Sequence, residues 1–296
     1  MPKHCIISGG SSGIGRALGR KLASRGYNLT LIARRPHLLQ EAKEEIRSFR
    51  AESQQRIDTY AADVSDRAQV EAAIEASAGQ LGAPDLVITS AGVAVPGYFG
   101  DAATADFERA MAVNYFGTLY IVRAALPTML VRQQGRIVLI SSGAALMGIF
   151  GYGSYGPSKF AVRGLGETLR AELRPNNIGV SIVYPPDTET PMLEEENKTK
   201  PLETKLISSL AKAWSADAVA DCILRGIDRN KFAITPGLTL SLMHRSPGII
   251  LPLLGWYCDR LVDRARRSID KAAGTAATES TRSDAEVAAL KYHSGR

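Results

Sequence analysis

The sequence predicts a single α/β domain built on a doubly wound parallel sheet. Short apolar segments alternate along the chain with amphipathic segments of helical length, and this order implies crossover connections between parallel strands. A glycine-rich turn joins the first apolar segment to the first helical one. The 296 residues are 45% hydrophobic and 22% charged, which suits one large core.

The alternation is regular from residue 3 to residue 184, and each predicted strand is a short, largely apolar run. The predicted strands are Lys3–Ser8, Asn28–Ala33, Ile57–Ala61, Asp85–Thr89, Arg136–Ile140 and Gly179–Tyr184. The predicted helices between them are Gly13–Arg25, Pro36–Ser53, Asp66–Gln80, Thr104–Leu130 and Tyr155–Arg174. Ile14, Leu18 and Leu22 recur every four residues in the first helix, the spacing of one buried face.

Composition argues against several classes of function. The net charge of +6 is modest, and no block of Lys and Arg is interleaved with aromatic residues, so we expect no nucleic-acid partner. Cys5, Cys222 and Cys258 are scattered, which predicts neither a metal site nor disulfides and fits a reducing compartment. The chain enters its first strand directly, so we expect a cytoplasmic protein without a signal peptide or N-terminal anchor.

The turn at Ser8–Gly15 is typical of a dinucleotide site. Glycines permit a tight turn and close approach to a pyrophosphate, and the following helix offers backbone N–H donors. The spacing is Gly-x-x-x-Gly-x-Gly, and a purely structural turn would also contain glycines. Its position between a strand and a helix favours dinucleotide binding. The expected contacts are Ser8, Gly9, Ser11, Ser12, Gly13, Ile14 and Gly15.

The end of the second strand indicates which dinucleotide binds. An acidic residue there would bind a ribose hydroxyl, whereas this chain has Arg34 and Arg35, which suit the 2′-phosphate of NADPH/NADP. The alternative is that both arginines are solvated surface charges. Asp63, followed by Val64, is placed to accept from the adenine amino group, or else to cap the next helix.

Tyr155 and Lys159 form a candidate acid–base pair. They are four residues apart, so they share a helix face one turn from each other. The lysine ammonium is expected to lower the pKa of the tyrosine from its ordinary value of about 10. Ser142 follows the fifth predicted strand, where its hydroxyl can bond a substrate oxygen. Together they predict proton donation to a carbonyl, although a Tyr-x-x-x-Lys pair alone is a common surface feature.

From residue 3 to residue 237, these motifs together resemble the short-chain dehydrogenase/reductase family, classical type, with its Rossmann fold. The resemblance rests on Gly9, Gly13, Gly15, Asp63, Ser90-Ala91-Gly92, Asn114, Ser142, Tyr155 and Lys159. It implies a catalytic tetrad in which Tyr155 donates the proton, Ser142 orients the carbonyl, Lys159 binds the nicotinamide ribose and Asn114 holds a relay water. It adds the cofactor contacts Ala91, Gly92, Tyr155, Lys159, Pro185, Thr188 and Thr190. Family members often pair through the helices carrying Asn114 and Tyr155, which implies a homodimer or homotetramer.

Two departures from the family pattern stand out. Ser90 replaces the usual asparagine, so the contact to the helix of Asn114 is expected to differ. Pro186 replaces a glycine, which removes a hinge and a backbone N–H. The Pro-Pro-Asp-Thr-Glu-Thr-Pro run that starts at Pro185, with the acidic stretch ending at Thr204, resembles the 3-ketodihydrosphingosine reductase branch. That branch reduces the ketone of 3-oxosphinganine to sphinganine with NADPH. The alternative is a charged, mobile lid shared by reductases of other substrates. Its acids Glu194, Glu195 and Glu196 could meet a substrate ammonium, or could simply be solvated.

Residues 238–271 are predicted to form a separate extension, followed by a loose tail at 272–296 with a short helix near Ser283–Leu290. The uncharged run from Pro247 to Cys258 is too short to span a bilayer. Tyr257, Leu261, Ala265 and Ile269 form an apolar stripe at helical spacing. Basic residues cover the other faces, namely Arg260, Arg264, Arg266, Arg267 and Lys271. This predicts peripheral binding to a membrane surface, the alternative being packing on the domain or a second subunit.

The leading hypothesis is therefore an NADPH-dependent reductase of a long-chain lipid ketone, 3-oxosphinganine. A reductase of another lipophilic ketone, such as a steroid or 3-oxoacyl compound, is the closest alternative. A non-catalytic NADP-binding sensor or scaffold is a further one, and the presence of Asn114, Ser142, Tyr155 and Lys159 together argues against it.

Overall fold

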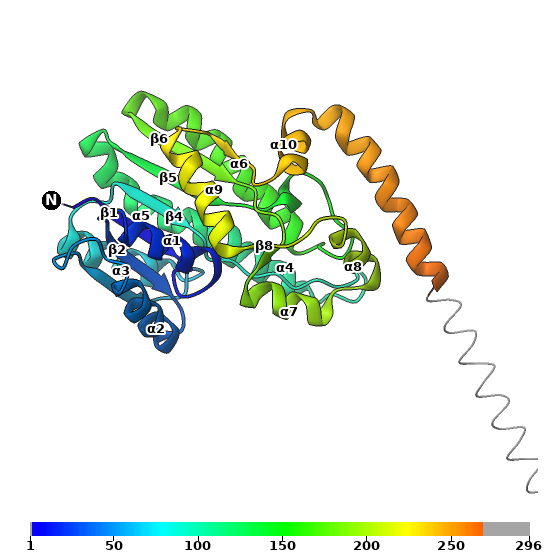
Figure 1. Cartoon of the computed structure of the whole chain (residues 1–296), viewed down its shortest axis with the longest axis horizontal. Helices are drawn as coiled ribbons and strands as arrows, with labels where there is room; N and C mark the ends of the chain where they lie inside the picture. The colour runs from blue at the N-terminus through cyan, green and yellow to red at the C-terminus, as the bar shows by residue number, and fades with distance from the viewer. Residues whose placement is uncertain (1, 269–296) are drawn as a thin grey trace, which may run out of the picture.

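A computed structural model describes residues 2–268. It shows one twisted sheet of parallel strands with helices on both faces (Figure 1). The strand order is β3-β2-β1-β4-β5-β6-β9, so the doubly wound parallel sheet predicted from the sequence is confirmed. The strand bounds are β1 His4–Ser8, β2 Asn28–Ala33, β3 Ile57–Ala61, β4 Leu86–Thr89, β5 Gly135–Ile140, β6 Ile178–Val183 and β9 Ala233–Ile234.

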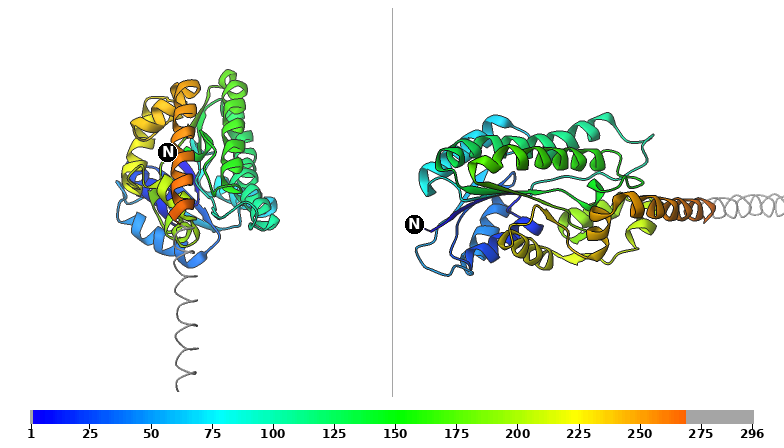
Figure 2. Two further views of the ribbon diagram at one scale, coloured as in Figure 1. Left: turned by 90° about the vertical axis from the view of Figure 1, so that its right-hand side faces the viewer. Right: turned by 90° about the horizontal axis from the view of Figure 1, so that it is seen from above.

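Two hydrophobic cores, one on each face of the sheet, hold the layers together. On one face Leu18, Ile46 and Ile223 belong to a core formed by three helices and the sheet. These helices are α1 Gly13–Ala23, α2 Pro36–Arg47 and α9 Ala216–Asp228. The opposite core includes Ile74 and Ile121. It is covered by α3 Arg67–Leu81, α5 Gly117–Arg132 and α6 Tyr155–Leu173, and the two layers are seen edge-on in Figure 2.

The second helix is shorter than the sequence predicts. It ends at Arg47, whereas the charged pattern predicted a helix to Ser53. Gln55 is buried and its amide donates to the carbonyls of Ala23 and Tyr27, each at 2.9 Å. These bonds hold the chain after α2 against the end of α1, which is incompatible with a continuing helix.

The long helix predicted over Thr104–Leu130 is continuous but changes its winding in the middle. It consists of α4 Thr104–Ala110, a π-helical turn Met111–Phe116, and α5. Such wider turns occur frequently at functional sites. Asn114 lies inside this turn and is fully buried.

The segment after β6 folds into a small subdomain over the carboxyl ends of the strands. Strand β7 Thr188–Glu189 pairs with β8 Trp214–Ser215. Between them lie α7 Pro191–Thr199 and α8 Leu202–Ser208. These short elements, and β9 at the sheet edge, were not predicted, because runs of two to nine residues carry little periodicity.

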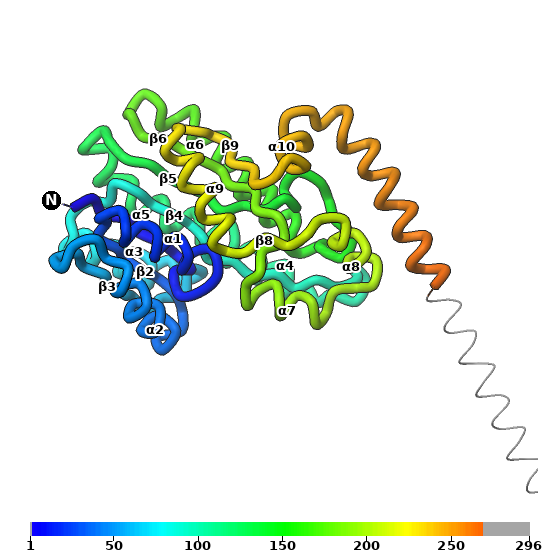
Figure 3. Tube along the Cα trace, in the orientation of Figure 1, coloured from blue at the N-terminus to red at the C-terminus, as the bar shows by residue number. Residues whose placement is uncertain are grey.

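The C-terminal segment leaves the sheet after β9 and runs across the end of the domain where α8 and α10 lie (Figure 3). It comprises α10 Leu238–Arg245 and a helix through the described residues 247–268, here called the C-terminal helix. Residues 269–271 of the predicted extension, the predicted tail 272–296 and its predicted helix lie outside the described residues. Within residues 2–268, no helix is both long enough and apolar enough to cross a membrane.

The apolar stripe predicted for this helix is only partly correct. Leu261 and Ala265 are buried, but Tyr257 is 44% exposed, and its place in the buried stripe is taken by Cys258. A second apolar face points outward instead. It consists of Ile249, Leu253, Trp256 and Tyr257.

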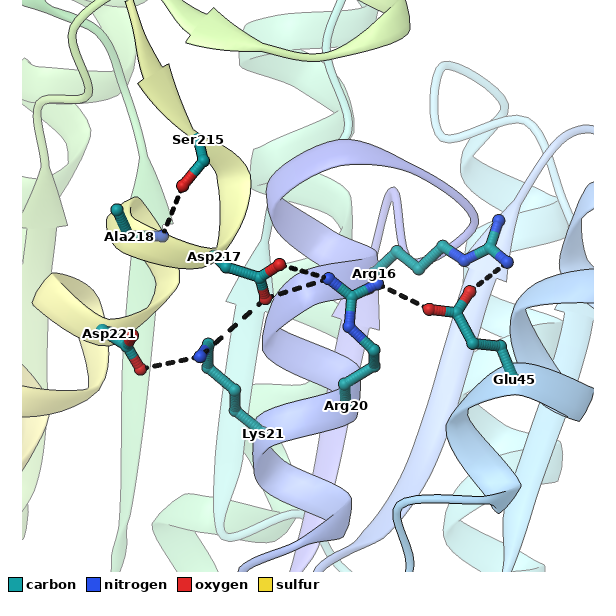
Figure 4. Close-up of polar contacts among 8 residues, drawn as sticks. All are labelled: Arg16, Arg20, Lys21, Glu45, Ser215, Asp217, Ala218 and Asp221. Carbon is teal, nitrogen blue, oxygen red and sulfur yellow. Dashed lines mark hydrogen bonds and ion pairs between the residues drawn. The ribbon is translucent and has the colours of Figure 1, made fainter.

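An ion-pair network joins the three helices of one layer (Figure 4). Arg20 of α1 pairs with Glu45 of α2 at 2.7 Å and with Asp217 of α9 at 2.9 Å. Arg16 also pairs with Glu45, and Lys21 pairs with Asp221 of α9 at 2.8 Å. Because one guanidinium bridges two helices, this network fixes α2 and α9 relative to α1.

Candidate active site

A cleft lies along the carboxyl ends of the parallel strands, and it collects most of the residues singled out in the sequence. Its walls come from the loops after β1, β2, β3, β4, β5 and β6. The strand order reverses between β1 and β4, and clefts at such switch points are the usual ligand sites of this architecture. The predicted residues that line it are Gly9, Ser11, Ser12, Gly13, Ile14, Arg34, Arg35, Val64, Ala91, Gly92, Ser142, Tyr155, Lys159, Pro185, Thr188 and Thr190.

The glycine turn is packed so closely that side chains cannot be added to it. A Cβ on Gly9, where φ is +70°, would lie 2.7 Å from the backbone nitrogen of Ala91. A Cβ on Gly15 would lie 2.3 Å from the carbonyl oxygen of Gly9. Gly15 and Ser8 are both buried and do not line the cleft, so they support the conformation of the turn from its protein-facing side. Ser12 precedes α1 and its hydroxyl makes no capping bond, so the N-terminus of α1 opens toward the cleft.

Arg34 and Arg35 follow β2 at the rim of the cleft, and both are exposed. Arg34 Nη1 lies 3.8 Å from the Asp63 carboxylate. Asp63 also accepts from the backbone N–H and hydroxyl of Ser65, at 2.9 and 2.7 Å. It is not the cap of α3, because Asp66 occupies that position and accepts from two backbone N–H groups. The helix-capping alternative for Asp63 is thus wrong.

Asn114 connects the π-helical turn to the loop after β4. Its side-chain oxygen accepts from the Val93 N–H at 2.8 Å, and its amide donates to the Val93 carbonyl at 2.9 Å and to Ser158 Oγ at 2.8 Å. The loop is thus held through its backbone at Val93, and this connection does not require a side-chain amide at Ser90. Asn114 is fully buried behind the cleft and all its side-chain polar groups are bonded to protein groups.

Ser142, Tyr155 and Lys159 meet at the centre of the cleft. Tyr155 is the first residue of α6 and is 8% exposed, while Lys159, one turn later, is 4% exposed. Lys159 Nζ lies 5.7 Å from the centre of the Tyr155 ring and donates to the Ile140 carbonyl at 3.1 Å. The loop of Ser142 is fixed by a bond of 2.9 Å from the Gly143 N–H to the carbonyl of Pro185. The structure thus brings together a phenol, an ammonium and a hydroxyl.

Burial, rather than charge, dominates the protonation of these groups. It raises the pKa of Tyr155 well above its ordinary value, and the neighbouring Ser142 hydroxyl offsets only part of the effect. The expectation that Lys159 would depress the pKa of Tyr155 is therefore wrong for the protein alone. Burial lowers the pKa of Lys159 to about 8. At neutral pH the phenol keeps its proton and the lysine is mostly charged.

A second polar cluster adjoins Tyr155 and was only partly foreseen. Tyr152 packs on Tyr155 with ring centres 5.5 Å apart and donates to Glu196 at 2.5 Å. Lys200 Nζ lies 3.6 Å from Glu196 and 3.4 Å from Asp187. Among the acids considered from the sequence, Glu194 and Glu195 are exposed, whereas Glu196 is buried and lines the cleft. In the sequence, the four-residue spacing of Glu196 and Lys200 was the feature that could have indicated this ion pair.

The subdomain over the cleft is anchored by buried contacts. Thr190 caps α7, accepting from the Leu193 N–H at 3.3 Å. In α8 the buried Glu203 accepts from the Tyr98 hydroxyl at 3.1 Å, and Thr204 donates to the Phe150 carbonyl at 2.9 Å. The C-terminal helix also reaches the cleft through Leu254 and Cys258, a contribution that the sequence did not indicate.

Comparisons with known proteins agree with this architecture. The family model described as short chain dehydrogenase matches residues 3–201. The chain is 41% identical over 235 residues to the 3-dehydrosphinganine reductase of Danio rerio, covering 79% of this chain and 71% of that protein. It is 41% identical over 230 residues to the 3-ketodihydrosphingosine reductase of Bos taurus, covering 77% and 69%. A solved short-chain dehydrogenase from Sphingobium yanoikuyae in complex with NADPH has a TM-score of 0.72 and 27% identity, covering 86% and 96%.

Proposed function

The chain belongs to the short-chain dehydrogenase family, and from this premise we propose that it reduces the ketone of 3-oxosphinganine to sphinganine with NADPH. The observation that carries the proposal of a ketone reductase is the buried, protonated phenol of Tyr155, set between Ser142 and Lys159 in the cleft. The names of the relatives at 41% identity support the choice of substrate.

The cleft fits the cofactor. The glycine turn after β1 lines the cleft at the N-terminus of α1, which is the position where this architecture binds a pyrophosphate. Ser11, Ser12, Gly13 and Ile14 would hold the phosphates at the N-terminus of α1. Arg34 and Arg35 would bind the 2′-phosphate from the rim, and their exposure is compatible with a solvated phosphate. The remaining contacts would come from Asp63, Val64, Ala91, Gly92, Pro185, Thr188 and Thr190.

In this proposal the protein side chains handle the proton and the orientation of the ketone. Bound NADPH supplies the hydride that the ketone carbon receives. Tyr155 gives its proton to the ketone oxygen, and Ser142 donates a hydrogen bond that orients this oxygen. Lys159 holds the nicotinamide ribose, and its charge stabilises the phenolate left on Tyr155. The side-chain amide of Asn114 is fully bonded, and its backbone carbonyl accepts from the Thr118 hydroxyl at 2.7 Å. The second lone pair of that carbonyl is the group that would hold the relay water.

Two acids near Tyr155, the buried Glu196 and the partly exposed Asp187, suit the amino group next to the substrate ketone. Asp187 and Glu196 both line the cleft. Within residues 2–268, Lys200 is the only cation paired with either of them, so two acids share one positive charge. A substrate ammonium would balance the second acid. Glu196 is thus the residue we assign to recognition of the amine, with Asp187 beside it.

We also place the protein at the cytoplasmic face of a membrane, where a lipid substrate resides. The outward face of the C-terminal helix presents Trp256 at 56% exposure and Leu253 at 64% exposure. Arg260 lies 4.0 Å from the Trp256 ring, and further arginines follow. Exposed aromatic and basic residues on one helix are typical of interfacial segments. Pairing of two or four copies through α5 and α6 remains part of this proposal.

The direct test of the catalytic assignment is Tyr155→Phe, which removes the hydroxyl and keeps the ring. NADPH-dependent turnover of 3-oxosphinganine should fall by about 10²–10⁴-fold, because the general acid is lost. Affinity for NADPH, measured by fluorescence titration, should stay within about twofold. Turnover equal to that of the wild type would show that another group donates the proton.

A further inference from the structure

A second cavity lies beneath the C-terminal helix, outside the cleft already described. It has a volume of about 760 Å³, within the size range of about 300–1,000 Å³ typical of small-molecule sites. Phe150, Pro157 and Phe160 form one wall, and Leu251, Gly255 and Val262 form the other. Among the described residues that line it, Asp259 is the only charged one. The walls are therefore suited to an apolar ligand.

This cavity adjoins the active-site cleft. Five residues line both spaces: Met147, Ile149, Tyr152, Ile207 and Cys258. Tyr152 stands at the junction, with its ring 5.5 Å from that of Tyr155. The second cavity therefore begins one aromatic ring away from Tyr155, where the ketone is proposed to bind.

The two spaces differ in polarity in a way that matches an amphipathic molecule. On the cleft side of Tyr152 lie the carboxylates of Asp187 and Glu196. On the other side the walls are aromatic and aliphatic. In an amphipathic molecule, the ammonium of the head group would lie near the carboxylates of the cleft. Its long hydrocarbon chain would lie between the apolar walls of the second cavity.

We propose that this second cavity binds the alkyl chain of the substrate, so that the C-terminal helix forms part of the substrate site. The proposal rests on the proposed function, because it takes the substrate to be a long-chain amino ketone. Each methylene buried there would improve binding about fourfold. Chain-length selectivity would thus be set by a wall of α6 and a wall of the C-terminal helix, rather than by the catalytic residues.

A larger side chain at Gly255 is expected to fill the cavity without a clash. It lies on the same helix face as Leu251, Cys258 and Val262, which all line the cavity. A Cβ built on it has no heavy atom within 4 Å, so a longer side chain extends into open space. In a helix, leucine is also better tolerated than glycine. Gly79→Leu is the matched control, because Gly79 is an exposed glycine of α3 with equally open surroundings.

The experiment compares 3-oxosphinganine with a homologue whose chain is truncated just beyond the ketone. Gly255→Leu should raise the KM for 3-oxosphinganine on the order of tenfold, because displacing two methylenes costs about fourfold each. Turnover of the truncated homologue should change less than about twofold. Gly79→Leu should leave the KM of both substrates unchanged. Gly148→Leu, on the opposite wall and with open space for a Cβ, provides a second variant with the same expected effect.

The proposal would be overturned if folded Gly255→Leu and Gly148→Leu changed the kinetic constants of both substrates equally. It would also be overturned if they changed those of neither substrate. A change in oligomeric state with unchanged chain-length selectivity would overturn it as well, because it would make the cavity a contact for a second copy. A wild-type protein that reduces neither substrate would instead refute the proposed function. The two failures are therefore distinguishable.

Discussion

At the scale of single residues, burial gives Tyr155 and Lys159 their chemical character. The phenol is held in its protonated form, which is the form that a ketone reduction consumes. The Lys159 ammonium can stabilise the phenolate that forms when Tyr155 loses its proton. Its pKa of about 8 lies close to neutral pH. The four-residue spacing in the sequence predicted their proximity, but burial depends on the loops after β4, β5 and β6, which no local pattern describes.

The lowered pKa of Lys159 leads to a pH prediction. Below a pH of about 8 the ammonium is charged and able to stabilise the phenolate. As the pH rises through that value the charge is lost, so kcat/KM for ketone reduction should fall by about tenfold per pH unit. Initial rates measured across this range provide the test.

Lys159→Arg is the control for this pH dependence. Its guanidinium keeps its charge up to a pH of about 12, so the decline near pH 8 should disappear even if overall activity is lower. An unchanged profile in this variant would assign the titration to another group.

At the scale of secondary-structure elements, the α2–α1–α9 layer depends on a single bridging side chain. Arg20 is 19% exposed and bonds to Glu45 and Asp217 at once. Arg20→Met should lower the free energy of unfolding by about 1–3 kcal/mol, since two charge-assisted contacts are lost. Urea denaturation measures this difference, which should shrink as salt is added.

Arg25→Met serves as the comparison for Arg20. Arg25 is 41% exposed and pairs only with Asp228 among the described residues. Its loss should cost less than about 1 kcal/mol. Equal losses in the two variants would mean that bridging of the helices by Arg20 adds no stability.

The elements also show where sequence-based prediction stops. The six longer strands and the helices between them have enough apolar residues to be recognised, and their bounds agree with the structure to within about two residues, except at the end of α2. The π-helical turn at Met111–Phe116 leaves the apolar spacing almost unchanged, so it could not be anticipated. Glu196 was considered as one of three similar acids, because only the packing of α7 onto Tyr152 distinguishes it.

At the scale of the whole molecule, the C-terminal helix has two apolar faces with different surroundings. One contacts the domain through Cys258, Leu261 and Ala265, and the other exposes Leu253 and Trp256. The stripe predicted from the sequence mixed residues from both faces, because helical spacing alone cannot say what packs on which side. The exposed face is the part available to a membrane.

Replacing Leu253 and Trp256 together by glutamate should release the protein from anionic vesicles. The substitutions put charges where apolar side chains would insert, so the fraction that floats with vesicles should fall on the order of tenfold. Val131→Glu is the control, since Val131 is 87% exposed on α5. Equal flotation of the double variant and the wild type would refute membrane binding through this face.

The measurement that tests the central claim most directly is the consumption of NADPH by the wild-type protein with 3-oxosphinganine. It should be run beside the N-acetyl derivative, which lacks the ammonium charge, and beside a steroid ketone and a 3-oxoacyl compound. We predict NADPH oxidation matched by sphinganine formation, with much slower turnover of the other three. Preferred reduction of the steroid or the 3-oxoacyl compound would contradict the proposed substrate, and rates unaffected by N-acetylation would contradict the role of Glu196.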